Sequence, residues 1–311
     1  MRAQAPIISA SRRTDIPHFF GAWFERRRRA GFVKARSVFG VTSSISLHPD
    51  NVGAFLFWTK NAEPFLKNLG SLADERIPFA FQYTINGYPE VIEPRTPELS
   101  QCIATFLKVR RLLPSSAAIQ WRYDPVLISR LTPPEWHLRQ FHTIAAQLAG
   151  HTQVVNCSVV QAYRSNIKRL QPLEVSFRPS SIDHQQTPLS AAGDETRQLL
   201  AELASIARAH GLQLRACADP GWGLPPAQCC SAELYSAHPE LLQKLARLKS
   251  KPTRSGCRCI PSADIGMDNT CIGGCAYCYA VRNPSRALEQ FEKHSPEAPA
   301  LNCSSHRDET R

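Results

Sequence analysis

The chain has 311 residues, of which 43% are apolar and 20% charged, both ordinary values for a soluble globular protein. This composition argues against a chain that is disordered throughout. Lysine and arginine outnumber aspartate and glutamate by 37 to 26, and the resulting formal charge of +11 would attract anions such as phosphates. The densest basic run, residues 26–29, is expected on the solvated face of an early helix.

The start of the chain does not look like a targeting signal. Arg12, Arg13, Asp15 and His18 occur before any long apolar stretch, which argues against a secretory signal. No window supplies ~18 uninterrupted apolar residues, so we expect no membrane association and a cytoplasmic location. Thiols stay reduced there, and an odd count of 11 cysteines then favours metal binding or catalysis over a disulfide framework.

Short β-rich runs alternate with helical patterns along the chain. The runs are of strand length and mostly apolar, as expected of a parallel sheet buried on both faces. The stretch 33–47 has β-branched alternation broken by Gly40 and predicts a hairpin or an irregular excursion. The predicted strands of the sheet cover residues 6–11, 54–59, 78–84, 118–123, 153–160, 212–217 and 263–267.

Three of the helices expected between these strands have recognisable start or stop residues. We expect one to open at Thr96 and Pro97, and a second to be capped by Thr132 and stopped by Gly150. A third is expected over about 194–210, closed by the following glycine.

Repeated strand–helix units wind either an open doubly wound sheet or a closed barrel. We favour a TIM-barrel-like (β/α) fold, full or partial, because polar residues recur where strands end. Arg12 and Asp15 follow the first strand, Lys60 the second, and Arg122 and Asp124 the fourth. Barrel enzymes keep catalytic residues at this carboxyl-terminal rim. The alternative is that Lys60, Arg122 and Asp124 form rim salt bridges.

The predicted barrel domain covers residues 1–283 and includes the cysteine-rich stretch 257–280. Residues 284–311 are expected to form one short helix, around 287–291, and then a flexible tail in which Cys303 is a free thiol.

Five cysteines lie close together near the end of the chain. A structural zinc site usually takes four ligands as two paired knuckles, and five cysteines do not divide that way. Three cysteines at gaps of three and two residues, with Tyr277 before the last, can instead ligate three irons of a 4Fe-4S cluster and leave the fourth open. The five are Cys257, Cys259, Cys271, Cys275 and Cys278.

The stretch 271–279 resembles the cluster motif of radical S-adenosylmethionine (SAM) enzymes. That resemblance implies a 4Fe-4S cluster on Cys271, Cys275 and Cys278, SAM bound at the open iron, and reductive cleavage of SAM to a 5′-deoxyadenosyl radical. It also implies a flavodoxin- or ferredoxin-type electron donor. Tyr277, inside the motif, is a candidate cofactor-binding residue.

The motif stands after the last predicted strand, whereas that superfamily carries it after the first. In a barrel the last strand neighbours the first, so the chain is interpreted as a circular permutation that returns the cluster loop to the same rim. Nearly the whole chain also resembles an uncharacterised bacterial family, catalogued as domain of unknown function 1848. The matching stretches are 7–17, 57–61, 121–125 and 257–280.

Arg12, Lys60 and Arg122 are candidates to pair with the cofactor carboxylate or an anionic substrate. Asp15 and Asp124 are candidates to hydrogen-bond ribose or to orient the arginines. The ends of the second and fourth strands are also similar to spore-photoproduct-lyase-like radical enzymes, which raises a nucleic-acid substrate as a possibility.

The remaining cysteines divide into two groups. Cys102 and Cys157 fall in apolar company and are expected to be core residues. Others are candidates for a second iron–sulfur cluster or a zinc ion, with unligated buried thiols as the alternative. This candidate second set is Cys217, Cys230, Cys257 and Cys259.

Two other functions compete with a radical SAM enzyme. One is a zinc-stabilised nucleic-acid-binding protein, suggested by the positive charge, although no basic helix is interleaved with stacking aromatics. The other is an iron–sulfur electron carrier that uses Cys257 or Cys259 as the fourth thiolate.

Overall fold

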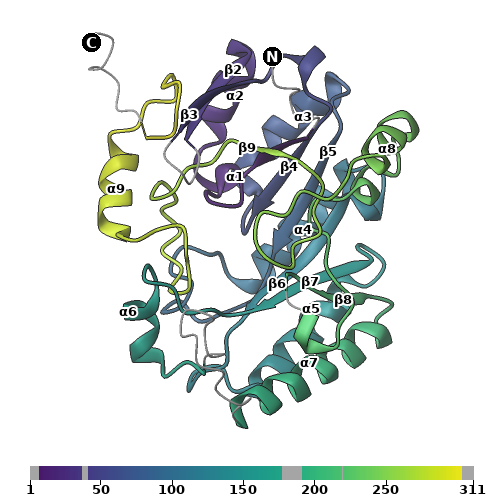
Figure 1. Cartoon of the computed structure of the whole chain (residues 1–311), viewed down its shortest axis with the longest axis vertical. Helices are drawn as coiled ribbons and strands as arrows, with labels where there is room; N and C mark the ends of the chain where they lie inside the picture. The colour runs from purple at the N-terminus through teal and green to yellow at the C-terminus, as the bar shows by residue number, and fades with distance from the viewer. Residues whose placement is uncertain (1–6, 37–40, 177–190, 219, 303–311) are drawn as a thin grey trace.

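Seven parallel strands form the main sheet of the protein in a computed structural model that describes residues 7–36, 41–176, 191–218 and 220–302 (Figure 1). Across the sheet the strands follow the order β8-β7-β6-β5-β4-β1-β9. Every pairing between neighbours is parallel. The strands are β1 (Ile7–Ala10), β4 (Ala54–Thr59), β5 (Phe79–Thr84), β6 (Ile119–Val126), β7 (Val154–Val159), β8 (Gln213–Ala216) and β9 (Ala263–Asp264).

The predicted strands are confirmed in place and in type. All residues of β1 and β4 are buried, as the continuous apolar runs indicated for a sheet covered on both faces. The excursion at 33–47 is confirmed as a hairpin of two antiparallel strands, β2 (Phe32–Arg36) and β3 (Thr42–Ser46).

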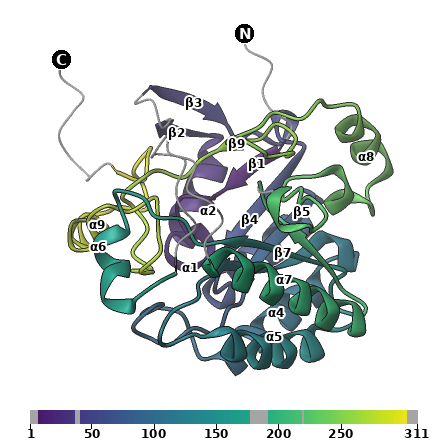
Figure 2. The same cartoon turned by 60° about the horizontal axis from the view of Figure 1, so that its bottom comes forward.

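Helices cover the sheet, and α4, α5 and α7 lie together on one side of it in both views (Figures 1 and 2). The helices α6 and α9 lie together elsewhere on the molecule, next to the cysteine-rich loop. The helices are α1 (Ile16–Phe19), α2 (Gly21–Ala30), α3 (Leu66–Asp74), α4 (Leu99–Leu112), α5 (Pro134–Leu148), α6 (Ile167–Leu170), α7 (Ala191–Ala209), α8 (Pro239–Ala246) and α9 (Pro284–Glu292).

Two predicted helix starts are wrong by one to three residues. The Thr132 hydroxyl donates to the carbonyl of Leu127 at 2.6 Å, so it does not cap α5, and Pro133 takes the cap position. The helix expected to open at Thr96 has its cap at Glu98. Differences of this size are usual at helix ends.

Residues after α9 pack onto the start of the chain. The Trp23 indole donates to the carbonyl of Ala298 at 2.8 Å, and the Lys34 amide donates to that of Pro299 at 2.8 Å. Residues 293–302, expected to be a loose tail, are therefore attached to α2 and β2. Cys303 lies outside the described residues.

The basic run 26–29 is only partly solvated, contrary to the sequence prediction. Arg27 and Arg28 are buried, and Arg28 pairs with Glu25 at 2.8 Å and with Glu75. Two of the four arginines therefore stabilise the packing of α2 against its neighbours.

The pairing of β9 with β1 places the end of the chain beside its beginning. Ile8 is opposite Ala263 and Ser9 is opposite Asp264, as expected if the last strand neighbours the first. The remaining strands follow in chain order on the other side of β1. This is the winding order of a (β/α) barrel, although no ladder joins β8 to β9 among the described residues. The established fold is α/β with a parallel sheet.

None of the helices in the described part of the chain has both the length and the apolar character needed to cross a membrane.

Gly266, just after β9, is expected to be required for this arrangement. A methyl group at Gly266 would lie 1.8 Å from Oγ of Ser11, whose side chain is held by a 2.8 Å hydrogen bond to Asp264. We predict that Gly266→Ala lowers the free energy of unfolding by ~1–3 kcal/mol, measured by denaturant titration. Gly70→Ala is the matched control, because a methyl group there meets nothing within 4 Å in α3. It should raise stability by roughly 0.5–1 kcal/mol. Equal effects of the two substitutions would contradict the steric argument.

Candidate functional site

The cysteine loop 271–278 lies against the carboxyl ends of several strands. Before the loop, the hydroxyls of Thr14 and Thr270 are 2.7 Å apart, which joins it to the end of β1. Within the loop, the Ala276 amide donates to the carbonyl of Ile92 at 2.9 Å, after β5. The side-chain amide of Asn166, after β7, donates to the carbonyl of Tyr277 at 2.9 Å. The cysteine loop therefore lies at the carboxyl-terminal edge of the parallel sheet.

The three thiols of this loop lie near one another. A methyl group at Gly273 would be 3.6 Å from Sγ of Cys271 and 3.7 Å from Sγ of Cys275. Burial, and then the Cys278 thiol, raise the pKa of Cys271 to about 12. Burial also raises the pKa of Cys275, and both other thiols add to that rise. All three side chains are half-buried, so the group remains open on one side.

The backbone of the loop is held from outside. Gly274 has φ of +72°, and a side chain there would meet Pro94 at 2.9 Å, so glycine is needed for this turn. Arg95 donates to the carbonyl of Ile272 at 3.0 Å. Arg169, in α6, donates to the carbonyls of Ala276 and Cys278 at 3.1 and 2.6 Å. These contacts order the loop without using its sulfurs.

The donor set consists of three thiols, the ligand type that iron–sulfur clusters use. Within the described residues no three Cys, His, Asp or Glu side chains are arranged to hold one metal ion. A cubane does not need such a convergence, because each thiolate binds a different iron. Three half-buried thiols on one glycine-containing turn are the donor type that such a cluster takes, so the residues present fit a 4Fe-4S cluster by their chemistry.

A cluster of buried polar side chains lies beside the thiols of the cysteine loop. Nζ of Lys60 donates to Oε1 of Glu93 at 2.9 Å, and Asn86 donates to the same oxygen at 2.8 Å. The Tyr277 hydroxyl, from the cysteine loop, donates to it as well. Although burial alone would lower it, Glu93 and then Cys275 raise the pKa of Lys60. The ammonium is therefore charged and directed at the loop.

Glu93 has one oxygen without a protein partner. The residue is 2% exposed, and Oε2 makes no hydrogen bond among the described residues. Buried carboxylate oxygens without donors are costly, so this atom is suited to receive a donor from a bound molecule. Glu93 and Cys102 also line a cavity of about 400 Å³ between β5 and α4. Sequence reasoning missed Glu93 because it lies in an irregular segment, with only its place after a strand as a signal.

The carboxylate of Asp15 is engaged by the chain itself. It accepts hydrogen bonds from the Thr59 hydroxyl at 2.7 Å, the Lys60 amide at 2.8 Å and the His18 amide at 3.0 Å. It thereby caps α1 and fixes the position of Lys60. Burial raises the pKa of Asp15 even against these hydrogen bonds.

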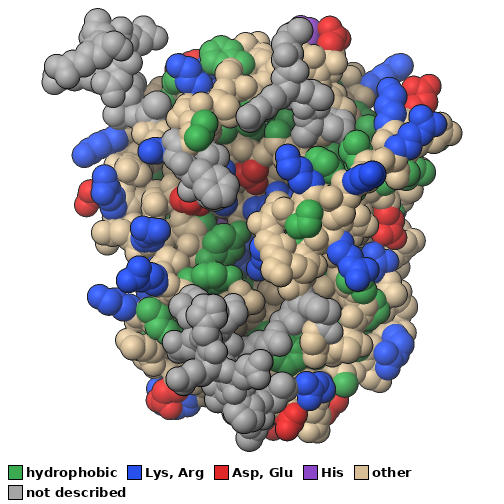
Figure 3. Space-filling model, in the orientation of Figure 1, with side chains coloured by type: hydrophobic (Ala, Val, Ile, Leu, Met, Phe, Trp, Pro, Cys, Tyr) green, Lys and Arg blue, Asp and Glu red, His purple; other side chains and the backbone are tan. Residues whose placement is uncertain are grey.

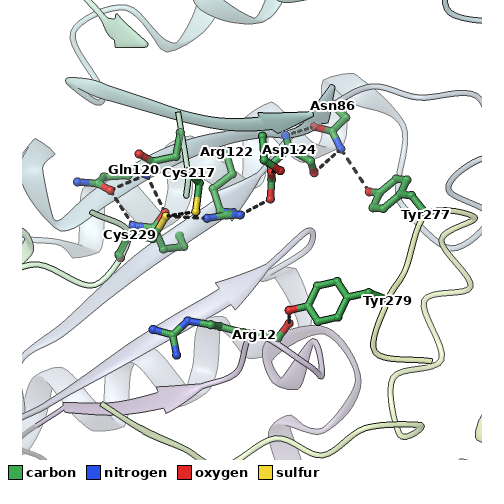
Figure 4. Close-up of polar contacts among 12 residues, drawn as sticks. Arg12, Asn86, Gln120, Arg122, Asp124, Cys217, Cys229, Tyr277 and Tyr279 are labelled. Atoms are coloured by element: carbon green, nitrogen blue, oxygen red, sulfur yellow. Dashed lines mark hydrogen bonds and ion pairs between the residues drawn. The ribbon is translucent and has the colours of Figure 1, made fainter. Parts of the chain in front are cut away.

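Arg12 and Arg122 face a second group of cysteines (Figure 4). Both guanidiniums lie over the ring of Trp58, at 4.9 and 5.0 Å from its centroid. Arg122 donates to Sγ of Cys229 at 3.1 Å. The predicted rim residues are thus divided, with Lys60 and Asp15 beside the cysteine loop and the two arginines beside other thiols.

Asp124 lies between the two groups. Its carboxylate pairs with Arg122 and accepts from the Ser158 hydroxyl. Burial opposes ionisation, but these partners lower the pKa of Asp124. Its backbone exchanges hydrogen bonds with Asn86 at 2.8 and 3.1 Å, and Asn86 reaches the Tyr277 hydroxyl at 3.3 Å.

The predicted second set has a further neighbour in Cys229, whose Sγ is 3.8 Å from Sγ of Cys217. The Cys230 amide donates to Sγ of Cys259 at 3.3 Å. The Cys230 thiol lies near Arg12, Ser262 and Cys257. Cys102 and Cys157 are buried in the core cluster, as expected.

Residues 7–280 match the model of a protein family described as a domain of unknown function, DUF1848. The chain belongs to this family. A search of curated proteins found no match. Among solved structures, the chain is similar to mannonate dehydratase from Streptococcus suis serotype 2, with 12% identity and a TM-score of 0.32 over 60% of each chain.

The buried Lys60–Glu93 pair is expected to contribute strongly to stability as a unit. We predict that Glu93→Gln lowers the free energy of unfolding by ~3 kcal/mol, because it leaves a buried ammonium without its counter-charge. The double variant Lys60→Met/Glu93→Gln should lose less than the sum of the two single variants, measured as a denaturant double-mutant cycle. Glu63→Gln is the control, since its pairing with Lys108 is about half exposed and should change stability by less than ~1 kcal/mol. Additive effects at Lys60 and Glu93 would contradict the coupling.

Proposed function

We propose that this chain is a radical SAM enzyme in which Cys271, Cys275 and Cys278 hold a 4Fe-4S cluster. The observation that carries the proposal is the meeting of three thiols from one glycine-containing turn with a buried, half-satisfied carboxylate at the carboxyl end of a parallel sheet. When bound, the cluster would supply the electron that cleaves SAM to methionine and a 5′-deoxyadenosyl radical.

The proposed function also implies a particular form of the α/β fold. We infer a partial (β/α) barrel that is circularly permuted relative to radical SAM enzymes. Two observations support it: the strands follow chain order across the sheet, and β9 lies beside β1 immediately before the cysteine loop. Moving the cluster loop from the first strand to the last then leaves it at the same edge of the sheet.

Residues of the chain provide the polar contacts that SAM would need. Its amino group and ribose hydroxyls are donors, and Oε2 of Glu93 is a buried acceptor without a donor. Lys60, Asn86 and Tyr277 all donate to Oε1 and so fix the orientation of that carboxylate. Glu93 would therefore position the cofactor, and Lys60 would act through Glu93.

The apolar surroundings of the loop are suited to excluding water. Ile92, Leu127 and Ala276 are buried in a small hydrophobic cluster under the loop. The Tyr88 ring packs beside the Tyr277 ring, with centroids 6.2 Å apart. An apolar surface that excludes water in this way protects a reactive species from solvent and from unwanted hydrogen donors.

A reduced electron carrier is the implied partner. Flavodoxins and ferredoxins are the expected class, and a net charge of +11 favours association with acidic proteins. Tyr279, at the end of the loop, is 51% exposed, so the loop reaches the surface. The substrate class that fits the charge is anionic, with nucleic acid included.

The two alternative functions have less support. Basic side chains are scattered over the face drawn in Figure 3 instead of forming one patch, and Arg28 of the densest run is buried, which weighs against a nucleic-acid-binding module. For an electron carrier, Cys257 or Cys259 would have to be a fourth ligand, but these thiols neighbour Cys229 and Cys230. An unchanged electron paramagnetic resonance signal after SAM is added to the reduced protein would favour the carrier.

Removing any one cysteine of the loop is expected to abolish SAM cleavage. We predict that Cys271→Ala, Cys275→Ala and Cys278→Ala each form no detectable 5′-deoxyadenosine after anaerobic reconstitution with iron, sulfide and a reductant. Iron and sulfide per chain should fall in parallel, because the cluster loses one of three ligands.

Cys157→Ala is the matched control, since this buried thiol of β7 lies outside the loop. It should keep both the iron content and the cleavage activity. A loop variant that still formed 5′-deoxyadenosine would overturn the assignment, and so would a reconstituted wild-type chain that holds iron but leaves SAM intact.

A further inference from the structure

A second group of thiols gathers where the connection from β8 to β9 folds back on itself. Cys217 follows β8, Cys229 lies twelve residues on, and Cys257 and Cys259 come before β9. Cys217 contacts Cys229 with sulfurs 3.8 Å apart. The Cys230 amide donates to Sγ of Cys259 at 3.3 Å, so the 257–259 segment lies beside the 229–230 turn. The four thiols therefore come together from three separate segments.

The backbone is built to bring these segments close. Gly256 has φ of +74°, and a methyl group there would lie 2.8 Å from the carbonyl oxygen of Ala218, directly after Cys217. The Ile260 amide donates to the carbonyl of Cys230 at 3.0 Å, which joins the 229–230 and 257–260 segments. Glycine is thus needed at position 256, where the chain approaches the carbonyl group of Ala218.

Several hydrogen-bond donors point at the sulfurs. Arg122 donates to Cys229 at 3.1 Å and Arg254 donates to Cys217 at 3.3 Å. The Cys230 amide donates to Sγ of Cys259 at 3.3 Å. The Thr253 hydroxyl donates to Sγ of Cys257 at 3.6 Å. Donors of this kind around cysteine sulfurs are what orients and stabilises metal-bound thiolates.

Guanidinium groups lie around these thiols. The charges of Arg12 and Arg122 are balanced by Asp264 and Asp124. Arg254 adds a further positive charge at the exposed edge of the group, where it donates to Sγ of Cys217. A metal-bound thiolate beside a guanidinium is stabilised by the opposite charge.

We propose that Cys217, Cys229, Cys257 and Cys259 bind a second metal centre, a single thiophilic divalent ion such as Zn²⁺. A zinc ion with sulfurs at about 2.3 Å sets neighbouring sulfurs about 3.8 Å apart, which is the spacing of Cys217 and Cys229. A cubane would hold them farther apart, because its inorganic core stands between the thiolates. The inference does not depend on the proposed radical chemistry.

Loading the site requires the thiols to converge. The described side chains do not surround one point as they stand. Rotation about χ1 moves a cysteine sulfur between staggered positions without moving the backbone, and by this movement binding would draw the sulfurs together. Binding would release the four thiol protons, and no oxidation is involved.

The test removes the first cysteine site so that only the second is measured. The full chain carrying Cys271→Ala, Cys275→Ala and Cys278→Ala is purified without oxygen, and zinc, iron and sulfide are counted per chain. We expect about one zinc and no sulfide, with X-ray absorption showing four sulfurs at about 2.3 Å. Adding Cys229→Ala should remove the zinc, whereas adding Cys102→Ala, at a buried core thiol of α4, should leave it in place.

The site can also be followed without that fourth substitution, in case it prevents folding. Stripping the triple variant with a chelator should lower its melting temperature, and adding zinc back should restore it. A triple variant that binds no zinc would overturn the proposal. So would zinc that survives Cys229→Ala, or iron with sulfide bound in place of zinc. A failure to cleave SAM would leave this result untouched.

Discussion

The short ladder between β9 and β1 is the constraint on which both cysteine groups depend. Only two residue pairs form it, but the Asp264 carboxylate reinforces it by accepting from the Ser9 and Ser11 hydroxyls and from the Arg12 amide. This carboxylate fixes the end of the chain against the turn after β1. The loop that follows must then leave the sheet at its carboxyl edge, where Asp15 and Lys60 already lie. The same contact determines where Arg12 points.

A continuous line of polar contacts joins the two cysteine groups (Figure 4). It runs from the Cys229 sulfur through Arg122 and Asp124 to Asn86, and then to the Tyr277 hydroxyl in the cysteine loop. Buried networks of this kind are rigid when every member is satisfied.

The sheet and the rim were predictable because they follow from local patterns. Continuous apolar runs such as β4 can only be buried strands, and residues after parallel strands share an edge. The choice between Cys229 and Cys230 was not predictable, because backbone torsions in an irregular loop decide which of two successive side chains meets Cys217. The direction of Arg12 depends on Trp58 and Asp264, which are distant in sequence. Glu93 has no periodic pattern around it, and only the tertiary structure shows its unpaired oxygen.

The two cysteine groups have surroundings of opposite character. Beside the loop at 271–278, the ammonium of Lys60 is matched by Glu93, and the thiols are half-buried and open on one side. Around Cys229, the guanidinium groups of Arg122 and Arg254 already donate to cysteine sulfurs. An open position is what exchange of a ligand requires, whereas a closed shell of thiolates suits a structural ion. On these proposals the second metal centre would fix the position of Arg122. Through Asp124 and Asn86 it would also help to position Tyr277 beside the first cluster.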